Sequence, residues 1–203
     1  MGISINAFTS EECTCYYAKS LPENLLKAIE IYTDMLMHPL FDKKELGREL
    51  KVILEEYKMY KNNPSSHASS MFSSEIMKGT SYEVDIIGTK KSIKNTTREM
   101  VIEYYKNHYC NKNCVICVTG KFDEQAVFDY LEQNFALFDR VKDREVCLVQ
   151  GHSSYTSYEK DDTEQSYVFC GTPIFGGADD RVDAMGILST LMGGSMSSRL
   201  FKS

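Results

Sequence analysis

Two glutamates, Glu49 and Glu56, are the residues of this sequence best placed to do chemistry together. They lie seven positions apart, about two turns of a helix, so on a helix both carboxylates fall on nearly the same line. An ionised carboxylate at the edge of an apolar face is costly unless it is paired, hydrogen-bonded or bound to a metal ion. The pair therefore predicts a metal or acid–base site. The alternative is two solvated charges on the flank of an acidic helix.

The segment that must position both glutamates is predicted to be one amphipathic helix over residues 42–60. Asp42 followed by Glu45 is an N-terminal capping pattern, and Pro64 with the two asparagines before it stops the chain beyond the helix. Apolar side chains recur at three- and four-residue spacing and form one stripe, with the glutamates at its edge. The stripe consists of Leu46, Leu50, Ile53, Tyr57 and Tyr60.

Two other groups of residues could do chemistry but fit their templates poorly. His108, Cys110, Cys114 and Cys117 are the ligand types of a zinc knuckle. Their spacing matches no strong template, and the last two would point to opposite faces of a strand. Residues 193–195, Gly-Gly-Ser, lack the Gly-Lys-Ser/Thr ending of a phosphate-binding loop. The glutamate pair remains the candidate site.

The remaining chain is predicted to mix strands and helices without strict parallel alternation, which favours an α+β fold. Alternating β-branched and aromatic residues predict two strands within residues 3–17, with a turn near Ser10. A helix is expected between Leu21 and Pro39. Further helices are expected at 65–78, 97–108, 123–134 and 180–192, strands at 114–119, 155–159 and 165–171, and a loop at 80–95.

A charged, irregular stretch after Phe138 is the best candidate for a domain boundary. We expect a first domain over residues 1–138, a linker over 139–152 and the beginning of a second, similar domain over 153–203.

Composition excludes several classes of function. The net charge of −6 and the absence of a basic tract interleaved with aromatics argue against a nucleic-acid partner. No apolar run approaches the roughly 18 residues of a membrane span, so no membrane partner is expected. Seven cysteines at irregular spacing, without a signal peptide, are typical of a reducing cytoplasm.

Four stretches together resemble the insulinase and mitochondrial processing peptidase family, the pitrilysin-type zinc metallopeptidases. They follow the order of that family and span nearly the whole chain. They are Asn6-Ala-Phe-Thr-Ser10 with Thr14 and Tyr16-Tyr-Ala18; Pro39-Leu-Phe41 with Arg48-Glu49 and Val52-Ile-Leu-Glu-Glu56; Tyr109 with Gly120-Lys-Phe-Asp123; and Leu191-Met-Gly-Gly-Ser-Met-Ser-Ser-Arg-Leu-Phe201.

The resemblance implies a zinc endopeptidase that hydrolyses peptides or unfolded segments with a metal-activated water. It implies a two-layer domain, with helices packed on one face of an antiparallel or mixed sheet. Glu56 falls on the family's third zinc ligand, and Glu49 falls on a second acidic catalytic position that supports the site. Asn6, Ala7 and Phe8 match a strand whose backbone pairs with an extended peptide substrate. The expected partner is a homologous domain or subunit, fused or associated.

One departure limits what this chain could do alone. It contains no His-x-x-Glu-His, the motif that supplies two histidine ligands and the general base in the family, and its four histidines are scattered. We expect that motif upstream of Met1 in a longer enzyme, and no activity from these residues by themselves. Two alternatives are a non-catalytic partner subunit, against which Glu49 and Glu56 argue, and a peptide-binding module that uses residues 6–10.

Overall fold

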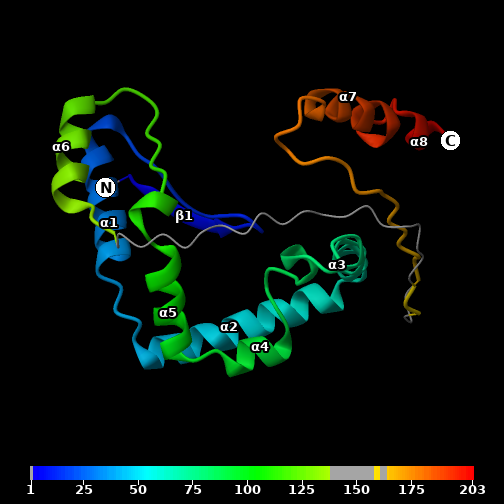
Figure 1. Ribbon diagram of the computed structural model, residues 1–203, viewed down its shortest axis with the longest axis horizontal. Helices are drawn as coiled ribbons and strands as arrows, with labels where there is room; N and C mark the ends of the chain where they lie inside the picture. The colour runs from blue at the N-terminus through cyan, green and yellow to red at the C-terminus, as the bar shows by residue number, and fades with distance from the viewer. Residues whose placement is uncertain (1, 138–157, 161–163) are drawn as a thin grey trace.

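The computed structural model describes residues 2–137, 158–160 and 164–203, and it confirms an α+β fold in which helices predominate. The predicted linker, residues 139–152, lies outside the described residues. The strands are β1 (Ser4–Thr9) and β2 (Thr14–Lys19), and the helices are α1 (Leu25–Met37), α2 (Lys43–Asn62), α3 (Pro64–Ile76), α4 (Lys90–Asn95), α5 (Arg98–His108), α6 (Glu124–Asn134), α7 (Val182–Gly193) and α8 (Arg199–Lys202). Figure 1 shows α7 and α8 at one end of the molecule, apart from α1, α5 and α6 at the other.

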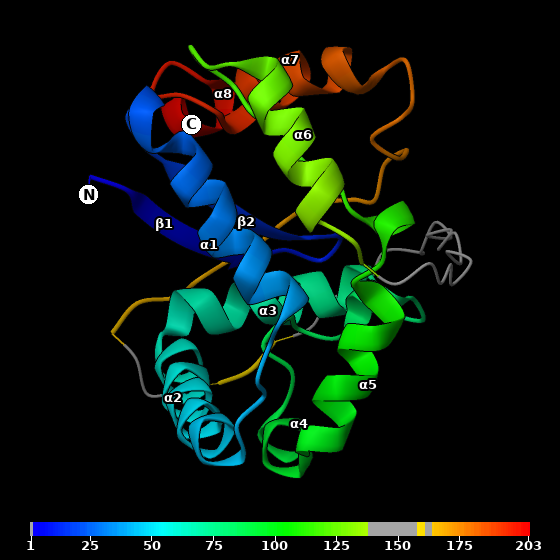
Figure 2. The same cartoon turned by 90° about the vertical axis from the view of Figure 1, so that its left-hand side faces the viewer.

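The two strands predicted within residues 3–17 form an antiparallel hairpin. Its register pairs Asn6 with Tyr17 and Ala7 with Tyr16, and the turn closes where the Ser10 amide donates to the Cys13 carbonyl at 2.8 Å. A two-stranded sheet is marginally stable by itself and needs a helix packed on one face. α1 supplies that cover and runs across the hairpin (Figures 1 and 2), with the rings of Tyr16 and Tyr32 in edge contact at 6.2 Å.

The predicted helix that carries the glutamates is α2. The Asp42 carboxylate caps it and accepts hydrogen bonds from the amides of Lys44 and Glu45, at 2.8 and 3.0 Å. The helix continues to Asn62, and Pro64 then sits in the first turn of α3, where its missing N–H costs nothing.

Two residues of α5 hold the corner between α1 and α2. Phe41 adopts a φ of +46°, a conformation that L residues rarely take and that costs on the order of 1 kcal/mol. The Arg98 guanidinium donates to the Phe41 carbonyl at 2.6 Å, and the ring of Tyr105 lies edge-on against the Phe41 ring at 5.3 Å. The Tyr105 hydroxyl also donates to the Leu36 carbonyl. These contacts set the direction in which α2 leaves α1.

Residues 80–95 are not the loop that the sequence predicts, because α4 forms over the last six of them. Thr89 and Ser92 cap its first turn reciprocally, and Ile93 is buried. A helix of six residues spans fewer than two turns, so it offers no repeat for periodicity to detect.

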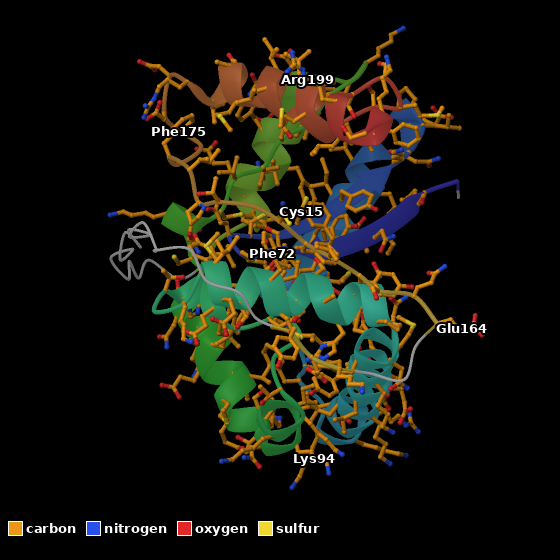
Figure 3. The ribbon with its side chains drawn as sticks, turned by 90° about the vertical axis from the view of Figure 1, so that its right-hand side faces the viewer. Cys15, Phe72, Lys94, Glu164, Phe175 and Arg199 are labelled. Carbon is orange, nitrogen blue, oxygen red and sulfur yellow. The ribbon has the colours of Figure 1, made fainter. Side chains whose placement is uncertain are left out.

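The predicted strands at 114–119 and 165–171 do not form in the described part of the chain. Neither segment pairs with another strand there, since the sheet in the described residues contains β1 and β2 alone. Of the third predicted strand, 155–159, the described residues 158–159 are likewise outside any strand. Apolar runs predicted these strands, but a strand also requires a neighbour, and Val115 and Val168 are 93% and 81% exposed. The later segment instead crosses α3, where Phe169 packs against Phe72 at 6.0 Å (Figure 3).

Few large side chains are buried among the described residues. The buried apolar residues are Ala28, Ile93, Cys110, Val127 and Leu137, whereas many apolar side chains of α7 and α8 are exposed. None of the described helices is both long enough and apolar enough to cross a bilayer.

Candidate functional site

The carboxylates of Glu49 and Glu56 are both exposed on α2 and, within the described residues, form no hydrogen bond or ion pair. Their neighbours behave differently. Glu45 pairs with Arg48 at 2.6 Å, and Glu55 pairs with Lys58 at 2.6 Å. Ion pairs three or four residues apart stabilise an exposed helix by about 0.2–0.5 kcal/mol each. The two predicted site residues are therefore carboxylates that α2 itself leaves available.

Glu56 fits zinc chemistry as one oxygen ligand, but the described residues do not complete a metal site around it. They contain no group of three or more histidine, cysteine, aspartate or glutamate residues that could hold a metal ion. Zinc sites use at least three protein ligands, so two must come from elsewhere. Of the histidines, His67 lies between Lys61 and Glu159 at 3.1 Å from each, and His108 stacks on Tyr104.

The zinc knuckle considered from His108, Cys110, Cys114 and Cys117 does not assemble in the described residues either. Burial raises the pKa of the Cys114 thiol, and the nearby Cys110 raises it further. A raised pKa opposes the thiolate form that a metal needs. These cysteines are free thiols, and Cys110 is packed in the small core.

The predicted peptide-binding residues Asn6, Ala7 and Phe8 lie on β1, which is exposed along its whole length. The hydroxyl of Tyr32 contacts both Asn6 and the carbonyl of Tyr17, its partner across the hairpin. The backbone groups of Asn6 and Tyr17 must therefore face each other. Because successive residues of a strand alternate in direction, the N–H and C=O of Ala7 face the outer edge.

That outer edge already carries one hydrogen bond. The side-chain oxygen of Asn6 accepts from the Ala7 amide at 2.9 Å. A peptide that adds to this edge would replace the Asn6 oxygen with one of its own carbonyls. Phe8 presents an exposed ring beside Tyr17, at 6.2 Å, on the face opposite Tyr16.

A tyrosine contact that the sequence did not reveal fixes the inner face of the hairpin. The hydroxyls of Tyr16 and Tyr109 are 2.8 Å apart and hydrogen-bonded. Burial, followed by this hydrogen bond, raises the pKa of Tyr109 above its ordinary value. No short-range pattern could reveal a contact between residues 93 positions apart.

The carboxylates of α2 and the edge of β1 are not in contact through any described hydrogen bond or ion pair. Figures 1 and 2 both show the hairpin and α2 in separate parts of the molecule. An apolar groove of about 630 Å³ lies elsewhere, between α6 and the extended segment before it, and none of the predicted site residues lines it.

Sequence comparison decides the family. Residues 1–90 match the family described as insulinase, peptidase family M16, and residues 95–203 match the domain described as the peptidase M16 inactive domain. The chain belongs to the insulinase family. This confirms the resemblance that the sequence motifs suggested.

Curated insulinase-family relatives carry the name of zinc protease. An uncharacterized zinc protease of Bacillus subtilis, YmxG, is 31% identical over the whole chain, which covers 49% of that relative. An uncharacterized zinc protease of Streptomyces coelicolor, SCO5738, is 30% identical over the whole chain, which covers 46% of it. The chain thus spans about half the length of the curated relatives it matches.

Two solved structures share the fold of this insulinase-family chain. One belongs to Complex III2 from Candida albicans, with a TM-score of 0.67 and 21% identity over 74% of this chain and 37% of that one. The other is the first half of the periplasmic protease PqqL from Escherichia coli, with a TM-score of 0.61 and 22% identity over 73% of this chain and 33% of that one. At these identities the likeness concerns the fold.

Proposed function

We propose that this chain is part of a zinc-dependent endopeptidase that hydrolyses peptides or unfolded segments. Membership of the insulinase family and the zinc-protease names of the relatives support the class of reaction. The observation that carries the proposal is the match of residues 1–90, which include the helix bearing Glu49 and Glu56, to the insulinase family. Both carboxylates are exposed on α2 and form no hydrogen bond or ion pair within the described residues, so they remain available to a metal ion.

The residues of this chain would have distinct roles. Glu56 would provide the third zinc ligand, and Glu49 would accept a hydrogen bond from a ligand and orient it. A bound zinc ion supplies Lewis-acid polarisation of the scissile carbonyl and lowers the pKa of a water molecule. The outer edge of β1, at Asn6, Ala7 and Phe8, would hold an extended peptide by backbone hydrogen bonds. The two histidine ligands and the general base would come from a His-x-x-Glu-His segment, which these residues lack.

The division into a first domain at 1–138, a linker at 139–152 and a second domain beginning at 153 is part of the same proposal. So is a homologous domain or subunit as the partner, since α7 exposes Ile187 and Leu191, which a covering domain would bury. We also propose a cytoplasmic location, supported by six described cysteines that are all free thiols.

The test is zinc binding by the whole protein, meaning this chain together with the polypeptide that carries His-x-x-Glu-His. Glu56→Gln should weaken zinc binding by at least about 10- to 100-fold, because removing a direct ligand costs no less than removing an outer partner. Cleavage of an internally quenched extended peptide should disappear with it. Glu55→Gln is the matched control, since Glu55 is adjacent, exposed and paired with Lys58. Elemental analysis measures the metal. Full zinc content in Glu56→Gln would show that the ligand assignment is wrong.

A second candidate is a non-catalytic partner subunit. The match of residues 95–203 to the inactive domain of the family favours it. The same experiment separates the two, because a whole protein that neither binds zinc nor cleaves the peptide belongs to the second class. A third outcome, peptide binding without zinc, would identify a binding module that uses the edge of β1.

A further inference from the structure

The hydroxyl of Tyr32 lies over the centre of the hairpin. Tyr32 projects from α1, and its oxygen is 3.2 Å from the amide nitrogen of Asn6, 3.0 Å from the Asn6 carbonyl and 2.6 Å from the Tyr17 carbonyl. All three atoms belong to one cross-strand pair. A single hydroxyl thus joins α1 to both strands at one rung of the ladder.

The chemistry of a phenol suits this place. Its oxygen can accept the Asn6 N–H while its one proton is donated to a carbonyl, and the shorter distance favours Tyr17 as the acceptor. Serine or threonine on α1 would be too short to reach the ladder, whereas phenylalanine would fill the same space without either hydrogen bond.

The ring that carries the hydroxyl is itself held in place. Tyr16 contacts it edge-on at 6.2 Å, and the Tyr16 hydroxyl is hydrogen-bonded to that of Tyr109. Tyr32 therefore cannot swing away from the ladder without disturbing a second anchored tyrosine. The rung that Tyr32 holds is adjacent to Ala7, whose N–H and C=O face the outer edge.

We propose that Tyr32 is a positioning residue for the peptide-binding edge of β1. By holding the rung at Asn6 and Tyr17, it fixes the direction in which the backbone groups of Ala7 point outward. An extended peptide of any side-chain sequence that pairs with this edge would need those groups in register. The inference rests on the proposed function, because it assumes that the edge pairs with a peptide.

The test compares Tyr32→Phe with the wild-type chain in two measurements. Amide hydrogen exchange, followed residue by residue by NMR, reports the hairpin, and fluorescence anisotropy reports binding of a fluorescein-labelled strand-length peptide of alternating valine and threonine. Loss of the hydroxyl should speed exchange at Asn6 and Tyr17 about 5- to 10-fold and should weaken peptide binding by a similar factor. Exchange in α5 and α6 should not change.

Two control variants separate positioning from general destabilisation. Tyr60→Phe removes from α2 an exposed hydroxyl that has no hydrogen-bond partner among the described residues, and it should change neither measurement. Val127→Ala opens the small core at α6, so it should lower the unfolding temperature without weakening peptide binding.

Different outcomes would contradict the positioning role of Tyr32 and the proposed peptide-binding function. Unchanged exchange in Tyr32→Phe would overturn the inference, and so would faster exchange with unchanged peptide affinity. Equal weakening of peptide binding in Tyr32→Phe and Val127→Ala would also overturn it, since the effect would then be general. If the wild-type chain does not bind the peptide, the proposed edge is wrong and the inference falls with it, while the zinc test of Glu56 stands independently.

Discussion

The hairpin and α2 carry the two parts of the proposed site, and they differ in how many side-chain hydrogen bonds hold the proposed site residues in place. The hairpin is fixed from one side by the hydroxyl of Tyr32 and by the bond between Tyr16 and Tyr109. On α2, the carboxylates of Glu49 and Glu56 are exposed and form no hydrogen bond or ion pair within the described residues. One part is pre-organised by contacts within this chain, whereas the other presents bare carboxylates.

The difference indicates which contacts fix the conformation of each part of the proposed site. Backbone pairing requires a rigid edge before the peptide arrives, because a mobile strand would lose conformational entropy on binding. A metal ligand can be ordered by the metal itself and by the other ligands. As the proposed zinc-site residues, the carboxylates of α2 would therefore need from this chain a rigid helix and a fixed direction, to which Asp42 and Arg98 contribute.

Among substitutions that test this difference between the hairpin and α2, Arg98→Ala is expected to change stability most. It removes a charge-assisted hydrogen bond to the Phe41 carbonyl, so the strained corner loses its support and the free energy of unfolding should fall by about 2 to 3 kcal/mol. Chemical denaturation measures the loss, and amide exchange should rise in the first turns of α2 while the hairpin stays protected. Arg48→Ala, which breaks an exposed ion pair of α2, is the control. Equal exchange in α2 of both variants would contradict the role of the corner.

A smaller effect is expected from the tyrosine pair. Tyr16→Phe or Tyr109→Phe should each lower the free energy of unfolding by about 1 kcal/mol, because each leaves one partly buried hydroxyl without its partner. In the double variant the cost should be less than the sum, since the shared bond is lost once. Tyr104→Phe, an exposed tyrosine of α5, is the control. Additive losses would show that the two hydroxyls do not act together.

Alkaline pH should weaken the hydrogen bond between Tyr16 and Tyr109. The folded protein raises the pKa of Tyr109, so the protonated phenol is favoured in the folded state. An unfolded tyrosine titrates near pH 10, so this contribution to stability is complete below about pH 10 and is lost as the pH rises above it. The unfolding temperature should therefore drop less steeply above about pH 10 in Tyr109→Phe than in the wild type. Parallel curves would exclude Tyr109 as the responsible group.

The smallest effect is expected at Glu49 and Glu56, which form no hydrogen bond or ion pair among the described residues. Replacing Glu49 and Glu56 together with glutamine should change the free energy of unfolding of the metal-free chain by less than about 0.5 kcal/mol, because neither carboxylate has a described partner. Thermal denaturation measures it. A loss above about 1 kcal/mol would mean that the carboxylates stabilise this chain, and the contrast with the hairpin would disappear.

Local patterns were enough to predict the hairpin, α2 and its Asp42 cap. Strand alternation and helical periodicity involve only a few neighbouring residues, so both patterns can be recognised in the sequence without knowledge of the fold. The site residues on these elements, Glu49, Glu56 and Asn6 to Phe8, remain predictions. The prediction of secondary structure was wrong at α4, because a helix of six residues is too short to show a repeating pattern of apolar residues. It was also wrong at 114–119, where an apolar run has no neighbouring strand in the described chain.

The sequence by itself determines which side chains share a face of a helix or of a strand, because the helical period of about 3.6 residues and the strand period of about 2 follow from backbone geometry. It could not show that Tyr32 reaches the rung between Asn6 and Tyr17, or that Arg98 holds a corner 57 residues before it. Such contacts arise when distant segments pack, and packing selects among many side chains with equal local propensity. For that reason the sequence alone could predict which residues of α2 are candidate site residues, whereas only the tertiary structure shows how Tyr32 holds the proposed peptide-binding edge.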